Sequence, residues 1–91
     1  MTPDRIAAAR AAALFASDLS SRCRPNRADV VTAIRTAIAA HGGVRGCVGE
    51  VAAAYGEYPE TAVPRMQWAR QTIQSTYSQA AAPAMANAAP S

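Results

Sequence analysis

The chain has 91 residues, a formal net charge of +3 and a hydrophobic content of 51%. This length allows one small domain, which buries only a modest fraction of its surface. Alanine supplies 24 residues, and only 22 are apolar residues of other types. Alanine favours helix but contributes little buried area, so the composition predicts closely packed helices with small side chains at their contacts.

All nine positive side chains are arginine, and the chain has no lysine. One interpretation is the codon usage of a GC-rich genome. The other is functional, because arginine suits phosphates and guanine edges better than lysine does. Nine positive against six negative charges is a small excess. It is compatible with nucleic-acid binding and equally with a need for solubility.

Several classes of protein are not expected. No apolar run is long enough to span a membrane, and the N-terminus lacks the features of a secretory signal, so we expect a cytoplasmic protein. Cys23 and Cys47 form no disulfide framework, and His41 is the only histidine, so we expect no metal or cofactor. No catalytic set of residues is present, and so small a domain has little room for a pocket, so we expect no enzyme.

The two cysteines have different surroundings in the sequence. Cys47 falls on an apolar helical stripe and is predicted to be buried. Cys23 lies between Arg22 and Arg24, where positive charge would favour a reactive thiolate.

Two helices are predicted in the first half of the chain. The first starts at Thr2 and Pro3, extends to about Leu19, and would cover the core or form a dimer interface through its alanines. Residues 20–25 form a loop, and Asn26 caps the second helix. That helix ends at Gly42, and its apolar stripe comprises Val30, Val31, Ile34, Ala37, Ile38 and His41.

Two further helices follow. The third starts near Val44 and ends at Gly56, and its glycines Gly46 and Gly49 cost up to about 1 kcal/mol each relative to alanine. Its predicted apolar face comprises Val44, Cys47, Val48, Val51, Ala52 and Tyr55. The fourth starts at Pro59, or nearer Thr61 because Pro64 removes a backbone bond. Its predicted core stripe comprises Ala62, Met66, Ala69, Ile73 and Tyr77.

The predicted fold class is therefore all-α. Four helices form a compact domain over residues 1–79. Residues 80–91 are rich in alanine and proline and contain nothing that fills a core, which predicts a disordered tail.

The last two helices have the spacing of a helix-turn-helix over about residues 44–78. Such a unit needs a small residue in the first helix, a glycine in the turn and apolar residues on one side of the second helix. The block resembles the helix-turn-helix of bacterial response regulators and sigma factors, with matches at Ala52, Gly56, Pro59, Thr61, Ala62 and Met66. It departs from that pattern at Glu57, where an apolar residue is usual, and at Tyr58, where serine is usual. The arrangement is also similar to that of small actinobacterial proteins.

The resemblance implies a transcription regulator that binds double-stranded DNA, with the fourth helix in the major groove and a homodimer as the usual form. Arg65 would contact guanine, or lie on the surface. Arg45 and Arg70 would contact phosphates. The predicted DNA-binding residues are Arg45, Tyr58, Thr61, Arg65, Trp68 and Arg70.

Four of these residues could instead serve the surface, the fold or a protein partner. Arg70 would lie on the surface, and Tyr58 would cap the core. Thr61 would cap its helix, and Trp68 would pack against the first helix or anchor a protein partner. The alternative function is accordingly a helical adaptor that binds another protein and not DNA, through the alanine-rich first helix or the Trp68 region.

Overall fold

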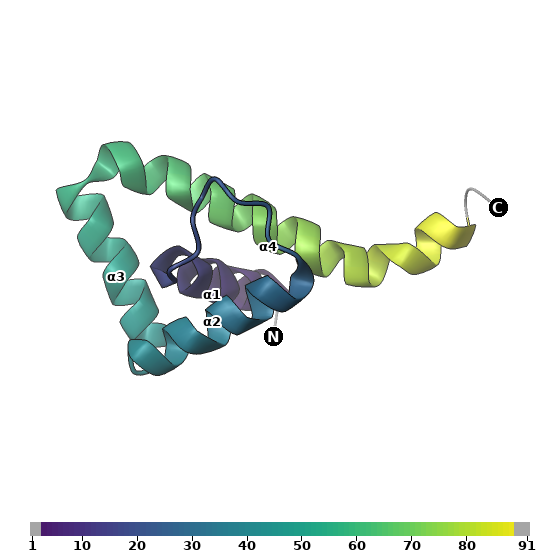
Figure 1. The fold of residues 1–91 in the computed structure, drawn as a ribbon, viewed down its shortest axis with the longest axis horizontal. Coiled ribbons are helices and arrows are strands. Elements are labelled where there is room, and N and C mark those ends of the chain that lie inside the picture. Colours follow the sequence, from purple (N-terminus) through teal and green to yellow (C-terminus); the bar gives the residue numbers. More distant parts are fainter. Residues whose placement is uncertain (1–2, 89–91) are drawn as a thin grey trace.

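The computed structural model describes the backbone of residues 3–88 and the side chains of residues 5–77. Four helices make up the fold: α1 (Pro3–Ala16), α2 (Arg27–Ala40), α3 (Val44–Glu57) and α4 (Pro59–Ala88). Residues 3–88 contain no strand, so the all-α prediction is confirmed. In Figure 1, α2, α3 and α4 surround α1, and the C-terminal end of α4 extends away from the other helices.

Helix α1 lies at the centre of the fold. It contacts each of the other three helices more extensively than they contact one another. Its residues 11–15 are all buried, and Ala13 and Leu14 are completely inaccessible. Small alanine side chains let the neighbouring helices approach closely. The alanines of residues 11–13 are therefore buried in the core of one chain.

Local signals in the sequence correctly place both ends of α2. Asn26 Oδ1 accepts a hydrogen bond from the Asp29 backbone N–H at 2.8 Å, and the Asp29 carboxylate accepts one from the Asn26 N–H at 3.2 Å. This reciprocal pair satisfies two free donors at the helix start. After α2, Gly42 and Gly43 adopt φ values of +74° and +117°, which glycine tolerates best.

Helix α1 ends three residues earlier than predicted. The Ser17 hydroxyl donates to the Leu14 carbonyl oxygen at 2.6 Å, and the Leu19 backbone N–H donates to the Ser17 hydroxyl at 3.2 Å. Serine side chains compete in this way with the backbone bonds of a helix. Residues 17–19 therefore belong to the connection between α1 and α2.

Helix α3 differs from the prediction in its end and in its buried face. It continues through Gly56, which has no positive φ, and only Tyr58 separates it from α4. Of its predicted apolar face only Cys47 is buried, and Val51 is half-buried. The other four members are exposed: Val44, Val48, Ala52 and Tyr55. Ala52, the expected contact point for the following helix, therefore does not form one.

Helix α4 starts at Pro59 and continues through Pro64. The missing N–H of Pro64 leaves the carbonyl of the exposed Glu60 to water, so the helix tolerates it. The predicted core stripe is confirmed, with Ala62, Ala69 and Ile73 buried, and Met66 and Tyr77 partly so.

The helix extends to Ala88, into the segment predicted to be a tail. Its side chains after Tyr77 lie outside the described residues, so the tail stays a prediction. Within the described part of the chain, no helix is both long and apolar enough to cross a lipid bilayer.

The two interior glycines of α3 have opposite surroundings, which generates a first prediction. A Cβ on Gly46 would overlap the backbone carbonyl of His41, whereas one on Gly49 would meet no atom within 4 Å. We expect Gly46→Ala to lower the free energy of unfolding by about 1–3 kcal/mol through overpacking. Gly49→Ala should raise it by about 0.5–1 kcal/mol, because alanine favours helix.

Urea unfolding of the two variants and the parent chain measures both effects. Equal changes in the two variants would contradict a tight turn between α2 and α3.

Candidate functional site

The densest set of polar contacts lies where α4 crosses the C-terminal end of α1. The Arg65 side chain, from the second turn of α4, donates from Nε to the Phe15 carbonyl at 2.8 Å. Its Nη2 donates to the Ser17 carbonyl at 2.9 Å, and its Nη1 to the Ser21 hydroxyl at 2.9 Å. The last carbonyls of a helix have no partner within the helix, and Arg65 satisfies that of Phe15 at the end of α1.

This arrangement is also favourable electrostatically. Helix α1 has no basic residue in its own last turn, and the positive guanidinium lies at the negative end of its dipole. Burial lowers the pKa of Arg65, and Asp18 partly opposes this shift. Arginine nevertheless stays charged at every physiological pH. Its guanidinium carbon also lies 5.1 Å from the Trp68 ring centroid, which is within the range of a cation–π contact.

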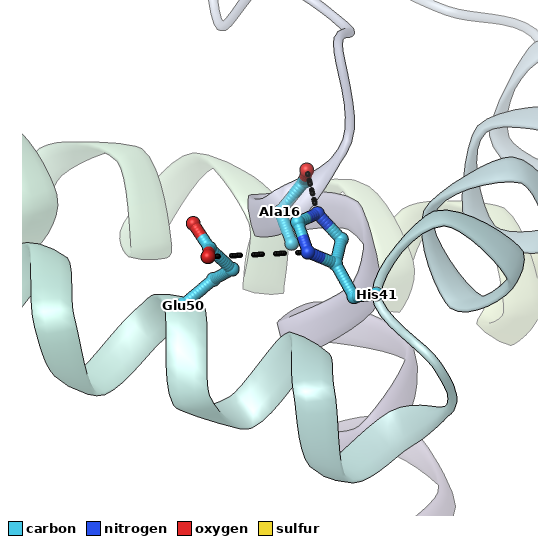
Figure 2. A network of polar contacts seen from close by, with 3 residues as sticks. All are labelled: Ala16, His41 and Glu50. Atoms are coloured by element: carbon cyan, nitrogen blue, oxygen red, sulfur yellow. Dashed lines mark hydrogen bonds and ion pairs between the residues drawn. The ribbon is translucent and has the colours of Figure 1, made fainter.

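His41 contributes a second contact at the same end of α1 (Figure 2). Its Nε2 lies 3.4 Å from the carbonyl oxygen of Ala16, and its Nδ1 lies 3.9 Å from a carboxylate oxygen of Glu50. Donation to Ala16 requires a proton on Nε2, and attraction to the Glu50 carboxylate requires a proton on Nδ1 as well, so only the imidazolium form makes both contacts. His41 thereby links the end of α1 to α3.

The structure gives Arg65 an intramolecular environment that the sequence did not predict. The predicted positions for this guanidinium were a guanine edge or the solvated surface, whereas in the fold it donates to carbonyls up to 51 residues away in the chain. No local pattern indicates such a distant acceptor. Reaching a base would require Arg65 to give up the bonds that cap α1.

The remaining predicted residues are spread over the surface. Tyr58 is 61% exposed, Arg45 and Arg70 are exposed, and Trp68 is half-buried beside Arg65. Arg45 and Tyr58 lie near opposite ends of α3, about 20 Å apart along the helix. The Thr61 hydroxyl donates to the carbonyl of Tyr58, the residue just before α4, at 3.2 Å. Thr61 therefore makes a local bond at the start of its helix, where a capping role was the alternative to a phosphate contact.

Charge is distributed unevenly between this region and the rest of the chain. Residues 44–64 contain one arginine and three glutamates, Glu50, Glu57 and Glu60, whereas the other residues contain eight arginines and three aspartates. Helix α3 and the start of α4 are therefore acidic within a basic protein, while the whole expected helix pair, residues 44–78, has three arginines and three glutamates. Acidic side chains repel phosphates, so this distribution disfavours a duplex at that surface.

Three glutamines on the outward side of α4 were not among the predicted site residues. Gln67, Gln71 and Gln74 are all exposed there. They are separated by four and three residues, so they follow the helical period on the side away from the core stripe. The same periodicity that located the core would have identified them.

A different feature dominates α3 and its junction with α4. Among the described side chains, six large hydrophobic residues are exposed, and five of them lie between residues 44 and 63. We call these five the junction surface; they are Val44, Val48, Tyr55, Tyr58 and Val63. Val44, Val48 and Tyr55 are separated by four and seven residues, so they form one stripe along α3.

A scan against known protein families matched no family model, and neither the curated proteins nor the solved structures contain a significant match. The described residues also contain no group of histidine, cysteine and acidic side chains placed to hold a metal ion.

Removing the cap on α1 generates a second prediction. Arg65→Ala leaves several carbonyls without a donor and should lower the free energy of unfolding by about 2–3 kcal/mol. Arg65→Lys keeps the charge but loses the planar guanidinium group and its several donors, so it should lower the free energy of unfolding by an intermediate amount. Thermal or urea unfolding measures both.

Arg35→Ala is the matched control, since Arg35 is exposed and makes no side-chain bond to another described residue. It should change the stability by less than about 0.5 kcal/mol. An Arg65 variant as stable as this control would show that the cap contributes nothing.

Proposed function

We propose that this protein is a helical interaction module that binds a partner protein through the junction surface. The observation that carries the proposal is the concentration of exposed apolar side chains on α3 and its junction with α4. Isolated exposed apolar residues are common on proteins, whereas several aligned on one helix are typical of a binding surface. Tyrosines in such a surface supply large contact areas and are frequent hot spots.

None of these five residues belongs to the buried core cluster, although the Tyr55 ring also stacks on Phe15, with centroids 6.4 Å apart. The buried cluster contains only Cys47 from α3, while α1 supplies five members. Val48 is 50% exposed, although valine lowers helix propensity relative to alanine. A partner that covers the stripe would bury this apolar area, which provides a favourable free energy of binding.

The surrounding charge indicates the chemistry of that partner. Glu50, Glu57 and Glu60 lie on the same segment as the junction surface, with Arg45 as the only positive residue there. Complementarity favours a partner segment with an apolar stripe flanked by lysine or arginine. An amphipathic helix laid against α3 fits a stripe that follows the helical period.

A third prediction tests this surface with two variants on one helix. Val48→Glu places a charge within the stripe, and Ala53→Glu places the same charge at an exposed position outside it. Partners are first identified by crosslinking through the junction surface, and each affinity is then measured by titration. We expect Val48→Glu to weaken binding about tenfold or more and Ala53→Glu to have little effect.

The crosslinked segment of the partner should be basic and amphipathic. A partner that binds the two variants equally, or that contacts the surface through an acidic segment, would refute the proposal.

The second candidate function is regulation of transcription by binding double-stranded DNA. Two features favour it: the helix-turn-helix spacing of residues 44–78 and the exposed glutamines on the outward side of α4. A glutamine amide forms two hydrogen bonds to an adenine edge in the major groove. In this arrangement Gln67 and Gln71 would contact bases, and Arg70 would contact the backbone. Arg65 would then support the helix from within.

A fourth prediction separates this candidate from the first. If α4 reads DNA, a gel shift should show binding that weakens steeply with salt. Gln71→Ala should then reduce affinity for the selected sequence by about 1–3 kcal/mol, with unchanged stability as the control. Val48→Glu should leave the affinity for DNA unchanged. Absence of any gel shift at low salt would exclude duplex binding.

A further inference from the structure

A polar cleft lies between the α1–α2 connection and α4, away from the junction surface. It has a volume of about 460 Å³, within the range typical of small-molecule sites. Arg22 and Arg24 line it from the connection, and Trp68, Gln71, Thr72 and Ser75 line it from α4. Binding of a partner protein at the junction surface would leave this cleft open.

The cleft is positive and has unused hydrogen-bond donors. Arg22 and Arg24 are exposed, and neither guanidinium is paired with another described residue. No carboxylate among the described residues lines the cleft. The hydroxyls of Thr72 and Ser75, which line the same cleft, are further hydrogen-bonding groups. Two arginines with hydroxyl groups beside them match the recognition of a phosphate group.

The connection holds the two arginines in a defined turn. The Arg22 backbone N–H donates to the Ser20 hydroxyl at 3.1 Å, and the Cys23 N–H donates to the Ser20 carbonyl at 3.2 Å. Ser21 is further attached to Arg65 at 2.9 Å, which ties the turn to α4. The two guanidinium groups therefore start from a backbone that is already placed beside the cleft, which reduces the entropy lost on binding.

Trp68 adds an aromatic wall to this positive site. Its side chain is half-buried and lines the same cleft. Indole rings stack well on flat heterocycles, and the indole N–H is a further donor. Inorganic phosphate alone would leave this wall unused, whereas a ligand that joins a planar base to a phosphate engages both parts.

We propose that this cleft binds a nucleoside phosphate, with the base against Trp68 and the phosphate between Arg22 and Arg24. Such a group occurs in a free nucleotide and in a single strand of nucleic acid. The proposal does not depend on the junction surface, because the two sites share no residue.

The single tryptophan of the chain makes the test direct. Trp68 fluorescence is followed during titration with AMP, adenosine, inorganic phosphate and a single-stranded oligodeoxyadenylate. AMP or the oligonucleotide should quench it saturably and bind more tightly than adenosine or phosphate. The double variant R22A/R24A should weaken this binding at least about tenfold, the loss expected from one charge-assisted hydrogen bond.

The double variant R35A/R45A is the matched control, since it removes the same charge from exposed positions outside the cleft. Its affinity should equal that of the parent chain. Cys23 provides a second readout, because it lines the cleft and is half-buried, while Cys47 is completely buried. Bound ligand should slow alkylation of Cys23.

The titrations distinguish the two sources of the ligand. Binding of AMP assigns the site to a free nucleotide, and binding of the oligonucleotide without AMP assigns it to a nucleic-acid strand. The proposal is overturned if neither ligand changes the fluorescence or the alkylation rate. It is also overturned if both double variants lose affinity equally, since that indicates general charge attraction.

Discussion

The capping of α1 from outside its own sequence is the interaction on which the rest of the structure depends. Helix α1 is the buried centre of the fold, and the carbonyls of Phe15 and Ala16 at its end accept from side chains of other elements. Arg65 from α4 and His41 from the α2–α3 turn provide these donors. Both are cationic or able to become so, which suits the negative end of a helix. One set of bonds thereby fixes three helices around α1.

Because α1 lies at the centre of the core, few side chains of α3 are buried. A short chain rich in alanine has few large apolar side chains, and α1, α2 and α4 hold most of those in the core. Helix α3 contributes one fully buried side chain, Cys47, and leaves Val44, Val48 and Tyr55 exposed along one stripe. This exposed apolar stripe is the feature on which the proposed interaction rests.

The junction surface and the cleft beside α4 differ in charge. Acidic residues accompany the junction surface, while unpaired arginines and a tryptophan border the cleft beside α4. The two regions are suited to opposite partners, a basic protein segment at the first and an anionic ligand at the second. The net charge of the whole chain conceals this division. Arg65 belongs to neither surface, although it lies between them in sequence, because its guanidinium is directed into the fold.

The sequence by itself determined the four helices, the caps at Asn26 and Gly42, the core stripe of α4 and the burial of Cys47. These follow from helical periodicity and from bonds within a few residues of each other. Only the tertiary structure decided the place of Arg65, the exposure of α3 and the continuation of α3 through Gly56. Each depends on which helix lies opposite a given face. A hydrogen-bond acceptor 50 residues away, such as the Phe15 carbonyl for Arg65, produces no periodic pattern in the sequence.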